Sequence, residues 1–241
     1  MLSGLHHVTC VCSNAQRTVD FYRDGLGFSL VKKTVNFDDP HSYHLYFGDE
    51  VGSPGTLLTF FEWPRAERGR LGRGTLQSIG LRTPAVAEAC EGEDPDGLRL
   101  RLYPAESPGL AAVVAIGNAA LYAGIVAPEA SLGFTEPSEE TALIGPGTTH
   151  HVAWRVPDDA EQQVWLQRLV EVGLRPTPVQ DRTYFRSIYF RMPDGILLEI
   201  ATDGPGFVVD EPREHLGAAL SLPPWLESER ATLERELAPI S

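Results

Sequence analysis

The sequence predicts an α+β fold that is built from repeated units, each with the order strand, helix and three strands. Strand-like and helix-like patterns follow this order over residues 1–74, and the same order returns over residues 148–204. Both copies begin with the tripeptide His-His-Val, at residues 6–8 and 150–152. A repeat of this kind indicates two modules that share one fold.

The first unit starts with a β-prone run from Gly4 to Ser13. Asn14 then suits the N-cap of an amphipathic helix. The apolar residues spaced for the buried face of this helix are Ala15, Val19, Tyr22 and Leu26. Three strand-like runs follow, separated by glycine and proline turn signals, over residues 29–37, 42–49 and 55–63.

The last unit repeats this order, beginning with a strand at Thr149. Asp158 and Glu161 have the spacing of a capping box and predict the start of the helix. Three strand-like runs follow, over residues 174–185, 187–195 and 196–203. Asp194-Gly195 predicts a tight turn between the last two.

Residues 75–147 contain weaker copies of the unit, and we expect two trimmed modules there. Strand-like runs lie at 75–84, 96–106, 110–118 and 139–144, with a helix-compatible stretch through Leu121 and Ile125. Residues 205–241 form a Pro/Gly-rich tail, in which Pro223-Pro224 predicts the start of a C-terminal helix on the outside of the fold.

Composition excludes several classes of function. The chain has 241 residues, of which 42% are hydrophobic, so it can bury a sizeable core. A net charge of −13 disfavours binding to nucleic acid. We expect no membrane span and no signal peptide, and therefore a cytoplasmic protein. Cys10, Cys12 and Cys90 cannot all pair, and Cys10 and Cys12 alternate as buried strand residues do, which favours a reducing compartment.

Alignment of the two complete units brings three metal-binding residue types together. His7 aligns with His151 on the first strands, and matching residues 55–60 with 195–200 places Thr59 opposite Glu199. Because side chains alternate on a strand, a cup formed by both units would gather His7, His151 and Glu199 on its inner face. Two histidines and one carboxylate form the facial triad that suits non-heme Fe(II).

Each of these residues also has a plainer interpretation. The two histidines could be polar residues at strand ends, and Glu199 a solvated charge. Glu199, however, lies in an apolar run, where burial of an unpaired carboxylate is costly. His6 and His150 point away from the metal face by strict alternation, so a role in supporting the ligands requires a twist or bulge, and both interpretations stay open.

Five stretches resemble the vicinal-oxygen-chelate dioxygenases that open para-hydroquinones: Gly4 to Asp39, Tyr43 to Trp63, His150 to Asp159, Asp181 to Phe207 and the Leu-Pro-Pro-Trp-Leu-Glu of the tail. The resemblance implies a glyoxalase-like fold of βαβββ modules around a metal-binding cup. It implies Fe(II) ligands at His7, His151 and Glu199. It also implies active-site residues at His6, Thr9, His150, Arg182 and Tyr189. Members of that family carry fuller middle units than residues 75–147 here.

We therefore expect an extradiol-type ring-cleaving dioxygenase that acts in aromatic compound catabolism. Its cofactor would be one divalent metal, first Fe(II), with Mn, Zn or Ni as alternatives. No organic cofactor is expected, since no Gly-rich phosphate loop is visible. Its partners would be a small hydroquinone- or catechol-like aromatic and O2, and a homodimer stays open.

Two other functions stay open. The first is a non-redox, glyoxalase-type metalloenzyme, although Thr59 stands where such sites take a second carboxylate. The second is a binding protein that sequesters an aromatic compound in the same cup. The trimmed middle units favour this second alternative, and the complete ligand set argues against it.

Overall fold

The computed structural model describes residues 2–122 and 131–241, and the first unit has the expected element order. Its elements are β1 (Leu5–Cys12), α1 (Ala15–Val19), the π-helical turn η1 (Asp20–Gly25), β2 (Ser29–Asn36), β3 (Asp39–Gly48) and β4 (Leu57–Glu62). Asn14 caps α1, because its side chain accepts a hydrogen bond of 2.8 Å from the backbone N–H of Arg17. The four residues predicted for the inner face of the helix are all buried.

The last unit also has the predicted element order, but the strand predicted over residues 174–185 forms only at Gln180–Asp181 and at Phe185, since Pro176 and Pro178 lack the backbone N–H that strand pairing needs. Its elements are β10 (Thr149–Val156), α2 (Asp159–Glu171), β11 (Gln180–Asp181), β12 (Phe185–Arg191) and β13 (Leu197–Pro205). Asp158 caps α2 by accepting a hydrogen bond of 2.9 Å from the backbone N–H of Glu161. Gly195 has a φ of 98°, which a tight turn between β12 and β13 requires and which glycine adopts without strain.

In its described residues, the middle of the chain has five strands, fewer than two complete units would have, and no long helix. Its elements are β5 (Leu76–Thr83), β6 (Cys90–Glu93), β7 (Arg99–Pro104), β8 (Gly109–Ile116), the short 3-10 turn η2 (Ala119–Leu121) and β9 (Leu132–Thr135). The strands predicted at 75–84, 96–106 and 110–118 correspond to β5, β7 and β8. Of the helix predicted through Leu121 and Ile125, only η2 forms within the described residues, and Ile125 lies outside them.

The strand predicted at residues 139–144 is wrong. Thr141 and Leu143 make only isolated bridges, to Arg73 and Arg70, and β9 takes the place beside β8. The segment packs on the loop before β5, where Gly72 has no side chain to hold it away. A Cβ at Gly72 would lie 2.6 Å from the backbone oxygen of Glu140.

The strands form two sheets, each of which joins two units. The large sheet has the order β11-β12-β13-β10-β1-β4-β3-β2-β14, and the small one has the order β6-β7-β5-β8-β9. In every unit the first and last strands lie side by side and parallel, as in the pairs β1–β4, β10–β13, β5–β7 and β8–β9. Antiparallel pairs β1–β10 and β5–β8 then join the units two by two within one chain.

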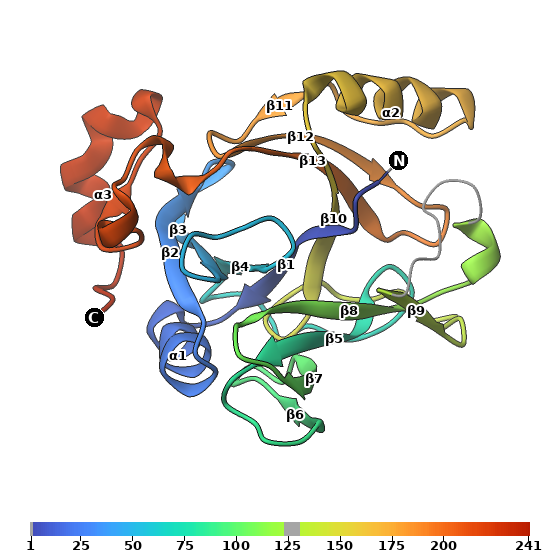
Figure 1. The fold of residues 1–241 in the computed structure, drawn as a ribbon, viewed down its shortest axis with the longest axis horizontal. Coiled ribbons are helices and arrows are strands. Elements are labelled where there is room, and N and C mark those ends of the chain that lie inside the picture. Colours follow the sequence, from blue (N-terminus) through green and yellow to red (C-terminus); the bar gives the residue numbers. More distant parts are fainter. Residues whose placement is uncertain (1, 123–130) are drawn as a thin grey trace.

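The main core lies between the two sheets and under α1 and α2 (Figure 1). Val8, Cys10 and Cys12 contribute from β1, and Leu81 and Leu102 from the small sheet. Both of these cysteines are buried free thiols, as predicted, and burial raises the pKa of Cys12 to about 12. None of the described helices is both long and apolar enough to span a bilayer.

The tail runs from the end of β13 to the opposite edge of the large sheet. It contains η3 (Phe207–Val209), η4 (Arg213–His215), β14 (Leu220–Ser221), η5 (Pro224–Glu229) and α3 (Arg230–Glu236). β14 pairs in parallel with β2, and α3 lies beside β2 and β3, far from α2 (Figure 1). The predicted helix thus begins as a 3-10 turn at Pro224 and becomes α-helical at Arg230.

A fully buried lysine holds the tail to β2. Lys32 Nζ lies 2.7 Å from Asp210 Oδ1 and also contacts Glu211. Asp210 accepts a further hydrogen bond of 3.0 Å from Tyr184, which precedes β12. The cluster therefore links the two edges of the large sheet through the tail.

Replacing this lysine should loosen the tail. Lys32→Met should lower the free energy of unfolding by about 3 kcal/mol, because it leaves two neighbouring carboxylates without their cation. The matched control is Arg213→Met. The ion pair of Arg213 with Glu50 is exposed, so its loss should lower the free energy of unfolding by less than about 1 kcal/mol. Urea unfolding and limited proteolysis of residues 205–229 measure both effects, and equal losses in the two variants would contradict the expectation.

Candidate metal centre

The three side chains predicted as metal ligands lie together on the inner face of the large sheet. His7 Nε2 lies 3.3 Å from His151 Nε2 and 3.2 Å from Glu199 Oε2. His151 Nε2 lies 3.0 Å from the same carboxylate oxygen. Within the described residues, this is the one group of three or more His, Cys, Asp or Glu side chains whose donor atoms are close enough for a single ion. Their binding of a metal stays a prediction.

Strand register explains why these residues meet. In the antiparallel pair β1–β10, His7 is opposite Ala153 and Thr9 is opposite His151. In the parallel pair β10–β13, Ala153 is opposite Glu199. Neighbouring residues across strands share a face, so all three donors point into the cup. Thr59 in β4 is opposite Thr9 in β1, just as Glu199 in β13 is opposite Ala153 in β10. Thr59 therefore has the place in the first unit that Glu199 has in the last, which confirms the alignment of the two units.

The charge at this centre calls for a cation. Glu199 is fully buried, and its Oε1 accepts a hydrogen bond from Ser187. Its Oε2 faces Nε2 of His7 and of His151, but among the described residues no hydrogen bond of regular geometry reaches it. Burial alone would raise the pKa of Glu199, but His7 and His151 lower it well below its usual range. Burial also lowers the pKa of His151, which favours the neutral imidazole that a metal needs. An orphaned carboxylate oxygen facing two imidazole nitrogens fits a divalent cation.

In each His-His pair, the first histidine contacts the second, which is the predicted metal ligand. His6 Nδ1 lies 2.9 Å from His7 Nδ1, and His150 Nδ1 lies 2.8 Å from His151 Nδ1. The register of β1 shifts between Leu5 and His7, which is the bulge that such a contact requires. Burial lowers the pKa of both His6 and His150 to about 3, so both rings are neutral near neutral pH.

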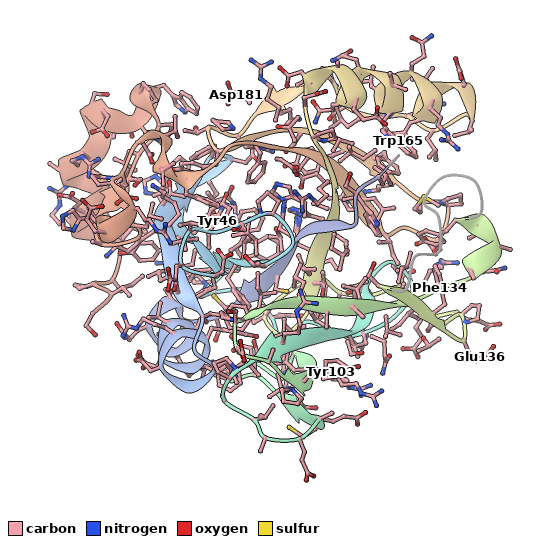
Figure 2. All side chains as sticks on the ribbon, in the orientation of Figure 1. Tyr46, Tyr103, Phe134, Glu136, Trp165 and Asp181 are labelled. Carbon is pink, nitrogen blue, oxygen red and sulfur yellow. The ribbon has the colours of Figure 1, made fainter. Side chains whose placement is uncertain are left out.

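A pocket of about 420 Å³ opens above the centre. Its walls are largely aromatic and apolar. They include Phe37, Phe61, Trp63, Phe185, Tyr189 and Leu197. Tyr46 lies on the inner face of the cup (Figure 2). The volume and the flat walls suit a single substituted aromatic ring.

Arg182 and Tyr189, which the family resemblance singled out, both line this pocket. Arg182 Nε donates a hydrogen bond of 3.1 Å to the Tyr189 hydroxyl, and its guanidinium lies 3.8 Å from Asp38 across the opening. Tyr189 also contacts the His151 ring edge to face, at 5.6 Å between centroids. Thr183, with a φ of 71°, makes the turn that follows Arg182, a conformation uncommon for a β-branched residue.

The other predicted active-site residues divide between the pocket and its floor. His150 lines the pocket, whereas His6 lies behind His7 and is 1% exposed. Thr9 is fully buried, and its hydroxyl lies 2.8 Å from that of Thr59.

Sequence reasoning set His44 aside because it falls at no repeated position, and it missed Tyr46. His44 lines the pocket; its Nε2 lies 3.1 Å from Thr59 Oγ1, and its Nδ1 lies 3.0 Å from the Tyr46 hydroxyl. Burial, aided by His151 and His7, lowers the pKa of His44 well below its usual range. The signal available in the sequence was alternation on β3, which puts His44 and Tyr46 on the face of Thr59 and Phe61.

Loss of any of the three candidate ligands should abolish metal binding. We expect one divalent metal per chain after anaerobic reconstitution with Fe(II), and none retained stoichiometrically in His7→Ala, His151→Ala or Glu199→Ala. His41→Ala and His215→Ala are controls that should bind as the unmodified protein does, since neither residue faces the cup. Metal analysis of folded protein is the measurement, and full occupancy in any of the first three variants would refute the ligand assignment.

Comparison with known proteins gives consistent relatives over the whole chain. Residues 4–200 match the family described as Glyoxalase/Bleomycin resistance protein/Dioxygenase superfamily. The Bacillus subtilis protein named "Putative ring-cleaving dioxygenase MhqA" is 35% identical over 313 aligned positions, covering 99% of each chain. A chlorohydroquinone/hydroquinone 1,2-dioxygenase of Sphingobium indicum is 30% identical, covering 98% of this chain and 96% of that protein.

A solved structure agrees with these relatives. The crystal structure of a "putative dioxygenase" from Bacillus subtilis has a TM-score of 0.90 and 32% sequence identity, and the match covers 100% of this chain and 98% of that one. The 313 positions aligned with MhqA exceed the 241 residues of this chain, so that relative carries segments that are lacking here. Sequence and fold together show that the chain belongs to the glyoxalase, bleomycin-resistance protein and dioxygenase superfamily.

Proposed function

We propose that this protein is an Fe(II)-dependent ring-cleaving dioxygenase of the extradiol type, which acts on a hydroquinone- or catechol-like aromatic. The observation that carries the proposal is the His7, His151 and Glu199 triad at the floor of an aromatic-walled pocket. The relatives, which are named as a putative ring-cleaving dioxygenase and a hydroquinone dioxygenase, support the same reaction class.

The donor set favours iron among the divalent metals. Two imidazoles and one carboxylate leave several coordination positions open, as non-heme Fe(II) oxygenases require. When bound, the metal supplies Lewis acidity and a common binding place for a phenolic oxygen and O2. Mn, Zn and Ni accept the same donors, so the identity of the metal needs direct analysis.

The pocket walls orient a ring and exclude water from it. Phe61, Trp63 and Phe185 offer flat surfaces for the ring, and Leu197 completes the apolar wall. Holding a ring in one orientation over the triad reduces the entropic cost of the reaction. Arg182, always protonated, lies where negative charge on a substrate oxygen would be stabilised.

His44 is the best placed group to hold or move a proton. Burial raises the pKa of Tyr46 well above its usual value, so its hydroxyl stays protonated, and it donates to Nδ1 of His44 in the tautomer that carries the ring proton on Nε2. His44 in turn carries its own proton on Nε2, toward Thr59. The ring can take up a proton that a substrate hydroxyl passes through Tyr46 only transiently, because the lowered pKa of His44 disfavours a lasting positive charge.

The reaction itself gives the direct test. Protein loaded anaerobically with Fe(II) should consume O2 with at least one member of a panel of hydroquinones and catechols and yield an acyclic, absorbing product. His44→Phe should retain the metal and lose turnover by about 10²- to 10⁴-fold, as expected for removal of a general acid-base group. Tight binding of these aromatics without turnover in the Fe(II) form would favour sequestration instead, and metal-dependent isomerisation or thiol addition would favour a glyoxalase-type enzyme.

Thr59→Glu tests the place where the repeat lacks a ligand. Thr59 has the same register to Thr9 as Glu199 has to Ala153, so a carboxylate at position 59 should reach the open side of the metal. The variant should keep or tighten its metal and lose O2 uptake, because the added carboxylate occupies a position that substrate or O2 needs.

Thr59→Val is the matched control, since it removes the hydroxyl without adding a donor. Metal stoichiometry, melting temperature and turnover are measured on one preparation of each variant. If a folded, metal-replete Thr59→Glu were fully active, position 59 would not face the metal. A fall in melting temperature with loss of metal would indicate the ordinary cost of a buried carboxylate.

A further inference from the structure

The two His-His pairs share an inner contact and differ at their outer ends. In both pairs Nδ1 meets Nδ1, at 2.9 Å for His6 and His7 and at 2.8 Å for His150 and His151. His6 Nε2 lies 3.2 Å from the carbonyl oxygen of Thr202. In the described part of the chain, no hydrogen-bond partner is found for His150 Nε2, and His150 borders the pocket.

The carbonyl group fixes the proton positions in the first pair. Thr202 O can only accept, so His6 carries its proton on Nε2 and its Nδ1 is an acceptor. His7 Nδ1 must then donate to His6, which leaves the Nε2 lone pair of His7 facing Glu199. This tautomer is the one in which a neutral imidazole can bind a metal through Nε2.

The same order of proton positions applies to His150 and His151, except that Nε2 of His150 faces the pocket and not a carbonyl group. When a metal is bound through Nε2 of His151, beside Glu199, the proton of that ring is on Nδ1, which then donates to Nδ1 of His150. The proton of an uncharged His150 is then on Nε2 and is available to a ligand in the pocket. Ring contacts hold His150 in place, with centroid distances of 5.4 Å to Phe61 and 6.0 Å to Trp63.

We propose that His150 is a specificity-determining residue, whose Nε2–H donates a hydrogen bond to the substrate oxygen that is not bound at the triad, and that His6 is a positioning residue, which fixes His7 through the Thr202 carbonyl. The role of His150 rests on the proposed function, whereas that of His6 rests on the triad alone. Two imidazole rings and one hydrogen bond separate Nε2 of His150 from Nε2 of His151. This donor therefore serves the far side of a bound ring, where a para-hydroxyl lies.

The two positions are matched controls for each other. The variants are His6→Leu, His6→Gln, His150→Leu and His150→Gln. Zinc affinity is measured by competition with a chromophoric chelator, and binding of hydroquinone and of phenol is measured by calorimetry on zinc-saturated protein, in which no oxidation occurs. Melting temperatures on the same preparations identify any variant that fails to fold, and the Gln variant then carries the comparison at that position.

The unmodified protein should bind hydroquinone about tenfold more tightly than phenol, as one additional hydrogen bond allows. His150→Leu should bring that ratio close to one, and His6→Leu should leave it unchanged. His6→Leu should weaken zinc binding by about 10- to 100-fold, as loss of a group that orients a ligand does. His6→Gln should restore most of this loss, because its amide can accept from His7 and donate to the Thr202 carbonyl.

Each role has its own contrary result. A hydroquinone-to-phenol ratio that is already near one, or that His150→Leu does not change, overturns the role of His150. Zinc affinity that is unchanged in folded His6→Leu, or that His6→Gln fails to restore, overturns the role of His6. Failure of the proposed function would instead show as absence of O2 uptake by the Fe(II)-loaded protein, which these binding measurements do not involve.

Discussion

The antiparallel pairing of β1 with β10 is the contact on which the candidate site depends. It joins the first and last units into one sheet, and its register brings His7 and His151 within 3.3 Å of each other. A slip of one residue would turn each imidazole to the convex side of the sheet, where Val8 and Cys10 are fully buried in the core. The apolar residues that alternate with the ligands therefore hold the ligands in place.

The polar groups at the floor of the cup surround the carboxylate of Glu199. Glu199 stays ionised in a fully buried position, while burial keeps His6, His44 and His150 neutral. The hydroxyls of Thr9 and Thr59 pair with one another instead of offering a second anion. One carboxylate beside two imidazole nitrogens favours a divalent cation and leaves coordination positions for other molecules.

The internal repeat made much of the candidate site predictable from the sequence. Two aligned units were enough to place His7, His151 and Glu199 on one face, because alternation along a strand is a local rule. His44 was set aside because it has no repeated counterpart, and its place depends on the pairing of β3 with β4. The contact of His6 with His7 depends on a bulge, which changes the direction of one side chain and leaves no mark in an alternating pattern.

The packing of residues 139–144 shows a related limit. Their β-prone composition predicted a strand, but the backbone of Glu140 finds a close fit at Gly72, and β9 pairs with β8 instead. Such competition between two partners for one sheet edge is decided by tertiary contacts, which local propensity does not describe.

The small sheet shows that topology alone does not make a metal centre. Its strand pairing repeats that of the large sheet, with Gly80 opposite Ala112 where Thr9 is opposite His151. By the same register, Ser78 stands in the place of His7, and Gly133 in the place of Glu199.

The small sheet thus keeps the framework of a cup without its donors. What it retains are the apolar residues of its other face, such as Ile79, Leu81 and Val113, which complete the core beneath β1. Among the described residues, the three candidate ligands and the residues that line the pocket all belong to the first and last units, so a trimmed middle removes none of them, and the small sheet covers the convex side of the large one.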